Sequence, residues 1–279
     1  MKKSLVSATL PFQVRQADVT DFADLLQTPK PADLAAVSSP VFAAVAFWPA
    51  IKQLLANGKT AWDFPGTLLA AQSFSFHRPI IVGESFIVQA AVERQNERGG
   101  MRLLQISCQL SNANGEMAVT GLSDFARSTT IPTLEAFSSA DTCAPVVSGQ
   151  TQDGLQSPNS LSFHITPDAL ARFCELVGDN NPIHFSDRCS LAGFESPIAP
   201  GLLTLGIALR TLSDNPDFSK RIRAIQARFA SPVVVPPAGA QLFCHATAEP
   251  IGNGTTVFAL GAQVGGSRVL ANAKALLAG

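Results

Sequence analysis

The chain repeats its landmarks at a spacing of about 153 residues. In SFSFHRPIIV, Phe76 stands three residues before Pro79, and in QARFASPVVV, Phe229 stands three residues before Pro232. The differences 229 minus 76 and 232 minus 79 are both 153. A period of this length indicates duplication of a whole domain, because solenoids repeat every ~20 to 50 residues. The chain therefore has to fold as two similar units.

Each half shows the same predicted order of elements. Pro40 precedes the apolar run FAAVAFWPAIKQLL, and Pro197 precedes GLLTLGIALRTL, at a difference of 157. Gly100 and Gly254 each open a turn between two alternating segments. The pattern predicts an early helix, a loop, a longer apolar helix and then about three or four strands joined by short turns. This order favours an α+β fold in which an antiparallel sheet covers the long helix.

A change of composition separates the two halves. The segment 128–160 is rich in Ser, Thr, Pro, Gly and Gln and has no sustained apolar period, which is typical of a linker. We therefore predict an N-terminal domain at 1–127, a linker at 128–160 and a C-terminal domain at 161–279.

Composition and charge exclude several classes of protein. Hydrophobic residues make up 46% of the chain and charged residues 15%, so a folded core is expected and disorder is not. The formal net charge is −1 and no block of like charge occurs, which argues against nucleic acid as a partner. No apolar run is long enough to span a membrane, and the N-terminus lacks a secretory pattern, so we expect a cytoplasmic protein with no membrane partner.

The five cysteines are widely spaced and form no C-x-x-C pair or zinc-binding pattern. Reduced thiols and no metal site are therefore expected. The chain also has no G-x-G-x-x-G, no P-loop and no H-E-x-x-H, so no nicotinamide, nucleotide or zinc-protease chemistry is indicated.

The first candidate site residues are Asp179 and His184, which lie in the segment DNNPIH after Gly178. Pro182 prevents a continuing helix, so only a loop can bring the carboxylate and the imidazole together. Such a pair facing one cavity can hold a water and move a proton near neutral pH. The alternative is a helix stop followed by an Asx-turn, in which Asp179 bonds to local backbone and His184 is simply buried.

The second candidate feature is the pair Pro200-Gly201. Gly201 lies seventeen residues beyond His184 (201 minus 184). Proline suits the first turn of a helix, and a glycine there leaves the backbone N–H open to a ligand. A helix N-terminus of this kind can donate a hydrogen bond to a developing oxyanion. Alternatively, the two residues only make a sharp turn into a packed helix.

Together these motifs are more specific than each alone. The stretch VGDNNPIH, followed by AGF and then PIAPGLLT, resembles the hydratase 2 signature of MaoC-like (R)-specific enoyl-thioester hydratases. The later RFASPVVV resembles the third strand of that family. With the duplication, the chain is similar to the fused double hot-dog members, including the bacterial 3-hydroxyacyl-thioester dehydratases. The resemblance implies two antiparallel sheets, each wrapped round a long helix and paired side by side.

The resemblance also implies a reaction and its residues. It is the reversible addition of water to trans-2-enoyl thioesters of CoA or acyl carrier protein in fatty-acid metabolism, with no cofactor. Asp179 and His184 match the catalytic dyad that holds water, and Gly201 matches the glycine whose N–H binds the thioester carbonyl. Asn181 matches the motif asparagine, as an orienter of the loop, and it is counted with Pro200 among the substrate-binding positions. Many relatives have histidine where this chain has Pro200. A hot-dog thioesterase and a non-catalytic thioester-binding subunit remain as alternatives.

The first half has no D-x-N-P-x-H motif. The resemblance therefore implies that it acts as a built-in partner that shapes the acyl pocket, in a monomer of two fused units or a homodimer. Trp48 in its apolar helix is either an acyl-lining or a plain core residue. The basic cluster of Lys220, Arg221 and Arg223 either meets a carrier phosphate or is only solvated. We expect His77 to be a surface or cross-strand residue and not a catalyst.

Overall fold

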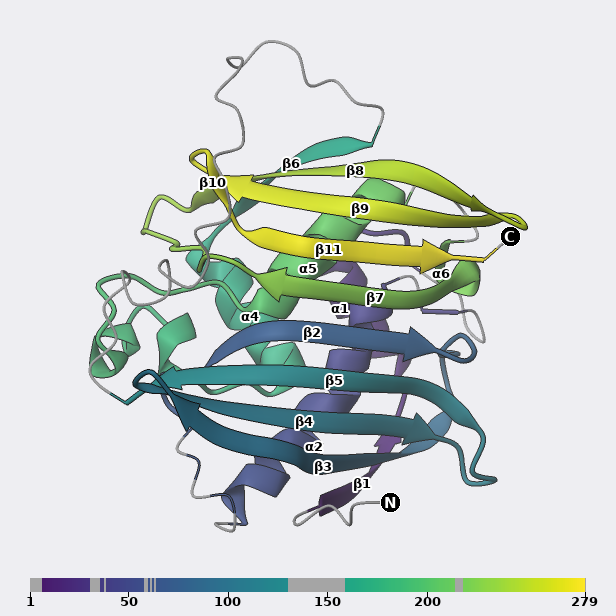
Figure 1. Cartoon of the computed structure of the whole chain (residues 1–279), viewed down its shortest axis with the longest axis horizontal. Coiled ribbons are helices and arrows are strands. Elements are labelled where there is room, and N and C mark those ends of the chain that lie inside the picture. Colours follow the sequence, from purple (N-terminus) through teal and green to yellow (C-terminus); the bar gives the residue numbers. More distant parts are fainter. Residues whose placement is uncertain are drawn as a thin grey trace.

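The computed structural model describes residues 7–30, 36–37, 39–57, 60, 62, 64–129, 159–213 and 218–278 (Figure 1). Most of the predicted linker, residues 130–158, lies outside this part of the chain. All statements below concern the described residues.

The first half builds five strands around a buried helix. The strands are β1 (Ser7–Gln13), β2 (Leu68–Phe76), β3 (Ser85–Arg98), β4 (Met101–Ser111) and β5 (Met117–Ser128), and the helical segments are α1 (Gln16–Leu26), η1 (Pro40–Phe42) and α2 (Ala43–Ala56). Helix α2 is apolar on nearly all sides and packs against β1, β3 and β4. A helix with this composition has to lie in the core, so the sheet curves over it.

The second half repeats this plan with a shorter central helix. Its strands are β6 (Ser160–Ile165), β7 (Ile222–Phe229), β8 (Ala240–Gly252), β9 (Thr255–Val264), β10 (Ser267–Arg268) and β11 (Leu270–Leu277). Its helical segments are α4 (Pro167–Val177), η2 (Pro182–His184), η3 (Cys189–Ala192), α5 (Gly201–Leu209), η4 (Arg210–Leu212) and α6 (Phe218–Arg221). Helix α5 is buried along its length and packs against β8 and β9.

The two halves share one continuous antiparallel sheet (Figure 1). Its strand order is β1-β3-β4-β5-β2-β7-β11-β9-β8-β6, with β10 paired to β9. The halves meet where β2 pairs with β7, and Ser73 faces Gln226 there. Because 226 minus 73 is 153, these are equivalent residues of the two units. The junction is thus a local two-fold axis, as expected when two copies of one domain pair through the same edge.

The helices lie together on one face of the sheet (Figure 1). Phe22 of α1 packs against Phe173 of α4 with ring centroids 5.9 Å apart. The Lys52 ammonium of α2 donates to the Gly178 carbonyl, at the end of α4, over 2.8 Å. In the described residues, no helix is long and apolar enough to cross a membrane. This arrangement confirms the predicted α+β double hot-dog fold, in which the two sheets join edge to edge.

The predicted turns at the glycine landmarks are tight hairpins. Gly99 and Gly100 have φ of 58° and 73° between β3 and β4, and Asn253 and Gly254 have φ of 52° and 69° between β8 and β9. Two consecutive residues with positive φ make the type I′ turn, whose twist matches that of the flanking strands. The duplicated glycines therefore mark the same hairpin in each unit.

Each half has a strand ahead of its early helix that the sequence pattern did not predict. These strands, β1 and β6, lie at the two outer edges of the sheet. Each pairs on one side only, with β3 and β8 respectively. An edge position tolerates Pro11 within β1, because the missing N–H faces away from the ladder. Short strands of this kind leave little periodicity to detect.

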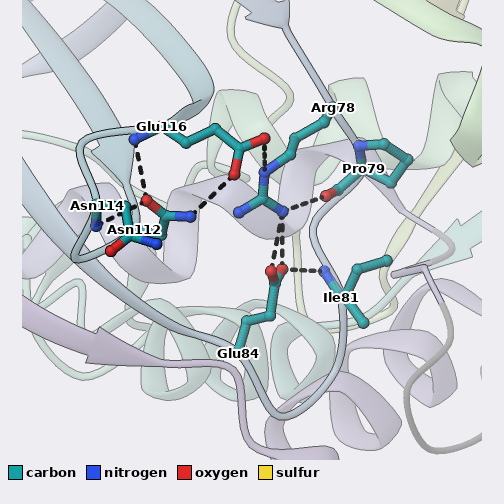
Figure 2. Close-up of polar contacts among 7 residues, drawn as sticks. All are labelled: Arg78, Pro79, Ile81, Glu84, Asn112, Asn114 and Glu116. Carbon is teal, nitrogen blue, oxygen red and sulfur yellow. Dashed lines mark hydrogen bonds and ion pairs between the residues drawn. The ribbon is translucent and has the colours of Figure 1, made fainter.

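A polar network secures the loops beyond the end of β2 (Figure 2). The Arg78 guanidinium donates to both carboxylate oxygens of Glu84 at 3.0 Å, and its Nε lies 3.5 Å from Glu116. Asn112 closes the 112–116 turn by donating to Glu116 and accepting from its backbone N–H. The neighbouring His77 is exposed, as predicted. This stretch therefore serves the structure of the first half.

Four of the five cysteines lie in the described residues, and all four are free and buried: Cys108, Cys174, Cys189 and Cys244. Burial raises the pKa of Cys244 to about 12, and it also raises the pKa values of Cys108 and Cys174. These three thiols are therefore protonated and unreactive at neutral pH. The described part of the chain holds no group of three or more His, Cys, Asp or Glu side chains suited to a metal ion.

We predict that cutting the chain between residues 138 and 157 leaves the two halves bound to one another. The β2·β7 ladder and the contacts in the helix layer do not need a covalent link. Size-exclusion chromatography after site-specific proteolysis checks this, and the two fragments should co-elute as one particle. Elution as two stable, independent monomers would contradict the shared sheet.

Candidate active site

The loop that carries the dyad begins where α4 is forced to end. The Thr166 hydroxyl caps the start of α4 by accepting from the Ala169 N–H at 3.1 Å. At the other end, Gly178 adopts a left-handed φ of 72°, and the Asp179 N–H donates to the Cys174 carbonyl over 2.7 Å. This glycine-based stop turns the chain away from the helix axis. Asp179 is thereby held rigidly at the first position of the loop.

Asp179 and His184 meet through this loop, as predicted. Pro182 starts the short helix η2, which ends at His184. The Asp179 Oδ2 atom lies 3.5 Å from His184 Nε2, and both side chains are buried. Asp179 Oδ1 accepts from the Asn181 N–H at 2.9 Å. The Asx-turn alternative is thus also observed, but it uses only one carboxylate oxygen and leaves the other beside the imidazole.

A backbone carbonyl fixes the tautomer of His184. The Nδ1 atom lies 2.6 Å from the Ile198 carbonyl oxygen. A carbonyl oxygen only accepts hydrogen bonds, so Nδ1 must carry the proton and donate it. In the neutral ring Nε2 is then an acceptor, and it faces the Asp179 carboxylate, which also accepts. Two acceptors at this separation can be bridged by one molecule that donates to both, which is what a water does.

Asn181 binds the dyad loop to the first half of the chain. Its Nδ2 donates to the Thr67 carbonyl at 2.7 Å, and its Oδ1 accepts from the Gly66 N–H at 3.1 Å. The side chain is 1% exposed. We name this pair of bonds, between Asn181 and residues 66–67, the Asn181 clasp. Its geometry makes Asn181 a residue that positions the loop, and contact with substrate stays a prediction.

A cavity of about 670 Å³ opens beside the dyad and is lined by both halves. Asp179, His184, Asn181, Pro200 and Gly201 all line it. The first half contributes mostly apolar side chains, among them Trp48, Phe64, Leu68, Leu69, Phe125 and Ala126. A deep apolar cavity with a few converging polar groups is the usual form of a small-molecule site. All five predicted site residues are thus brought together, and the first half completes the wall.

The cavity lies where β2 and β7 separate. Their ladder runs only over 71–75 and 224–228. The residues just outside the ladder, 68–70 on β2 and 229–230 beyond it, line the cavity. The short ladder therefore leaves a gap at one end of the junction, directly above the dyad loop.

Pro200 and Gly201 form the start of α5, as predicted. Pro200 is the N-cap with an extended ψ of 133°, and Gly201 is the first helical residue. Backbone N–H groups in the first turn of a helix have no acceptor within the helix, and the helix dipole adds positive charge there. This start faces the same cavity as the dyad, which provides a donor for an oxygen that gains negative charge.

The sequence predicts that glycine at 201 leaves the backbone N–H open to a ligand. In the structure, the neighbour of Gly201 is the side chain of Phe229. A Cβ added to Gly201 would lie 3.0 Å from the ring of Phe229. A protein side chain therefore packs closely against this side of Gly201. Phe229 was not identified as a site residue from the sequence, because the two positions are 28 residues apart (229 minus 201) and only the fold joins them.

The structure also shows where Trp48 and the basic cluster of 220–223 lie. Trp48 lies in the cavity wall, with its ring 5.7 Å from that of Phe64. The basic cluster of 220–223 lies at the opposite end of β7 from the cavity. Its Arg221 donates to the Ala278 carbonyl and its Arg223 donates to the Lys220 carbonyl. Both guanidinium groups therefore bond to nearby backbone carbonyls, and contact of this cluster with a carrier phosphate stays a prediction.

The Asn181 clasp predicts that Asn181→Asp, which exchanges one nitrogen for an oxygen, destabilises the fold. Asn181→Asp replaces the donor to Thr67 with an acceptor, so one buried bond becomes a repulsion. We expect the free energy of unfolding to fall by about 1–3 kcal/mol. The matched control is Asn180→Asp, because Asn180 is exposed and its substitution should stay within ~0.5 kcal/mol. Urea unfolding measures both, and equal losses in the two variants would rule the clasp out.

Comparison with known proteins finds similarity mainly in the second half of the chain. The MaoC-like domain family matches residues 151–259. A stretch of 81 residues is 47% identical to the peroxisomal multifunctional enzyme type 2 of Mus musculus and covers 27% of this chain but 11% of that protein. The 3-hydroxyacyl-thioester dehydratase X of Mycobacterium tuberculosis is 26% identical over 182 residues, which cover 63% of this chain and 60% of that protein. In both cases the match spans less than two thirds of the relative's length.

Solved structures extend the similarity to both halves. A MaoC-like dehydratase superimposes with a TM-score of 0.79 at 16% identity, over 99% of this chain and 98% of that chain. HtdX of Mycobacterium tuberculosis superimposes with a TM-score of 0.71 at 19% identity, over 98% of this chain and 99% of that chain. At these identities the superpositions establish the shared fold.

Proposed function

We propose that this chain, a double hot-dog protein whose residues 151–259 match the MaoC-like domain family, catalyses the reversible hydration of 2-enoyl thioesters. One observation carries the proposal: a buried carboxylate and imidazole and the start of a helix all face a single apolar cavity. The first pair suits a water molecule, and the helix start suits a thioester carbonyl. A 2-enoyl thioester presents the two reacting carbons between these groups.

The proposed mechanism begins with the carbonyl. The Gly201 N–H donates to the thioester oxygen, and the α5 dipole stabilises the negative charge that develops on it. Water bridges Asp179 Oδ2 and His184 Nε2. Its oxygen forms a bond to C3 while the π electrons of the C2=C3 bond move onto the carbonyl oxygen as an enolate. One water proton passes to the dyad, and the enolate collapses by taking a proton from the dyad at C2.

The finer features of the proposal rest on the family resemblance and on the chemistry of the step. By family resemblance the product is the (R)-3-hydroxyacyl thioester, with CoA or acyl carrier protein as the carrier. Atoms and charges balance with water and the dyad alone, so we propose no metal or redox cofactor. Among the described residues, those of the first half that line the cavity carry no acid or base, and they supply its apolar wall and the Asn181 clasp.

Two alternatives make different products. A thioesterase would release free thiol from the same substrates, and a binding subunit would leave them unchanged. Loss of the ultraviolet absorbance of the conjugated enoyl thioester, without thiol release, supports hydration. Thiol release or an unchanged spectrum across a series of enoyl-CoA chain lengths would overturn the proposal.

The dyad assignment predicts that Asp179→Asn and His184→Gln each lower kcat for hydration by at least ~100-fold. Both changes are nearly isosteric, so the fold should remain intact by circular dichroism. The matched control is His77→Gln, because His77 is exposed in the first half. Steady-state kinetics on the best substrate measure all three. Turnover close to wild type in either dyad variant would show that the proton moves elsewhere.

The aromatic wall predicts control of acyl length by Trp48. Its ring packs 5.7 Å from Phe64 and 5.8 Å from Phe125 at the side of the cavity that the first half supplies. Trp48→Leu removes part of this wall while keeping an apolar side chain. We expect kcat/KM for longer acyl chains, relative to short ones, to rise by about 10-fold. An unchanged ratio across an acyl-CoA series would mean that the acyl chain does not reach Trp48.

A further inference from the structure

Phe229 combines three properties that no other described residue in the cavity wall is shown to share. It is the last residue of β7, at the end where β2 and β7 separate. It lines the cavity. Its ring carbons lie 3.0 Å from the position that a Cβ added to Gly201 would take, so the ring would have to move by a few tenths of an ångström to admit a side chain there. The ring therefore packs directly on the first residue of α5.

We infer that Phe229 is a positioning residue for the thioester carbonyl. The inference rests on the proposed function and deepens it, because it names the side chain that sets the donor. Contact with the ring fixes the first turn of α5, and hence the Gly201 N–H, relative to the dyad. The apolar ring also keeps water from that side of the donor, and a hydrogen bond to developing charge is stronger when water is excluded.

The backbone of Gly201 explains why glycine is needed only for this contact. Its φ is not among the positive values of the chain, so an alanine would meet no backbone strain. The obstacle is the Phe229 ring alone. In the first half, the landmark offset of 157 places Ala44 where the second half has Gly201. That half has no dyad motif, so the glycine occurs only in the half that carries Asp179 and His184.

A double-mutant cycle tests the inference with enoyl-CoA as the probe. Gly201→Ala should lower kcat by roughly 10- to 1,000-fold, because the added methyl group displaces the ring and the first turn together. Phe229→Leu alone should lower kcat by about 10-fold with little change in KM. Together, the two changes should lower kcat no more than Phe229→Leu does alone, about 10-fold below wild type, because the leucine leaves room for the methyl group and removes the further loss caused by Gly201→Ala.

The matched control is Phe76→Leu, the equivalent strand position in the first half (229 minus 76 is 153). It should neither lower kcat nor rescue Gly201→Ala. If Phe229 had a merely structural role, the fold-losses in kcat of the two single variants would multiply in the double variant. That result would overturn the inference, and the proposed function would stand as long as the wild-type protein hydrates enoyl-CoA. A wild-type protein that hydrates no enoyl-CoA would overturn the proposed function and this assignment with it.

Discussion

The short antiparallel ladder between β2 and β7 is the interaction on which the rest of the structure depends. It joins two sheets through equivalent residues and then stops, at Ala71 on one strand and Arg228 on the other. Because the strands separate at that point, a cavity forms between the halves and not inside either one. A longer ladder would close the gap above the dyad loop, and no ladder would leave the loop without its second wall.

The duplication let the two halves take on different tasks. The second half keeps an acid, an imidazole and a glycine at a helix start, whereas the first half presents aromatic and aliphatic side chains to the same cavity. The halves remain interdependent, since the Asn181 clasp ties the dyad loop to residues 66–67 and Lys52 bonds to the end of α4. The chemistry that we propose for one unit therefore relies on backbone atoms of the other.

Local patterns predicted much of this structure, and long-range contacts did not follow from them. Thr166, Gly178 and Pro182 act on their own neighbours, so the cap, the helix stop and the dyad loop were predictable from the sequence. The Phe229–Gly201 contact, the Asn181 clasp and the opposite placement of the 220–223 cluster arise only when distant segments meet. The edge strands β1 and β6 were missed for the related reason that they pair on one side only.

Hydration in water enriched in oxygen-18 tests the central claim most directly, since it follows where the solvent oxygen goes. If the dyad directs water to C3, mass spectrometry finds the label in the hydroxyl group of a 3-hydroxyacyl thioester whose bond to CoA is intact. Label in a released carboxylate, accompanied by free CoA, would contradict the account and assign the cavity to thioester hydrolysis.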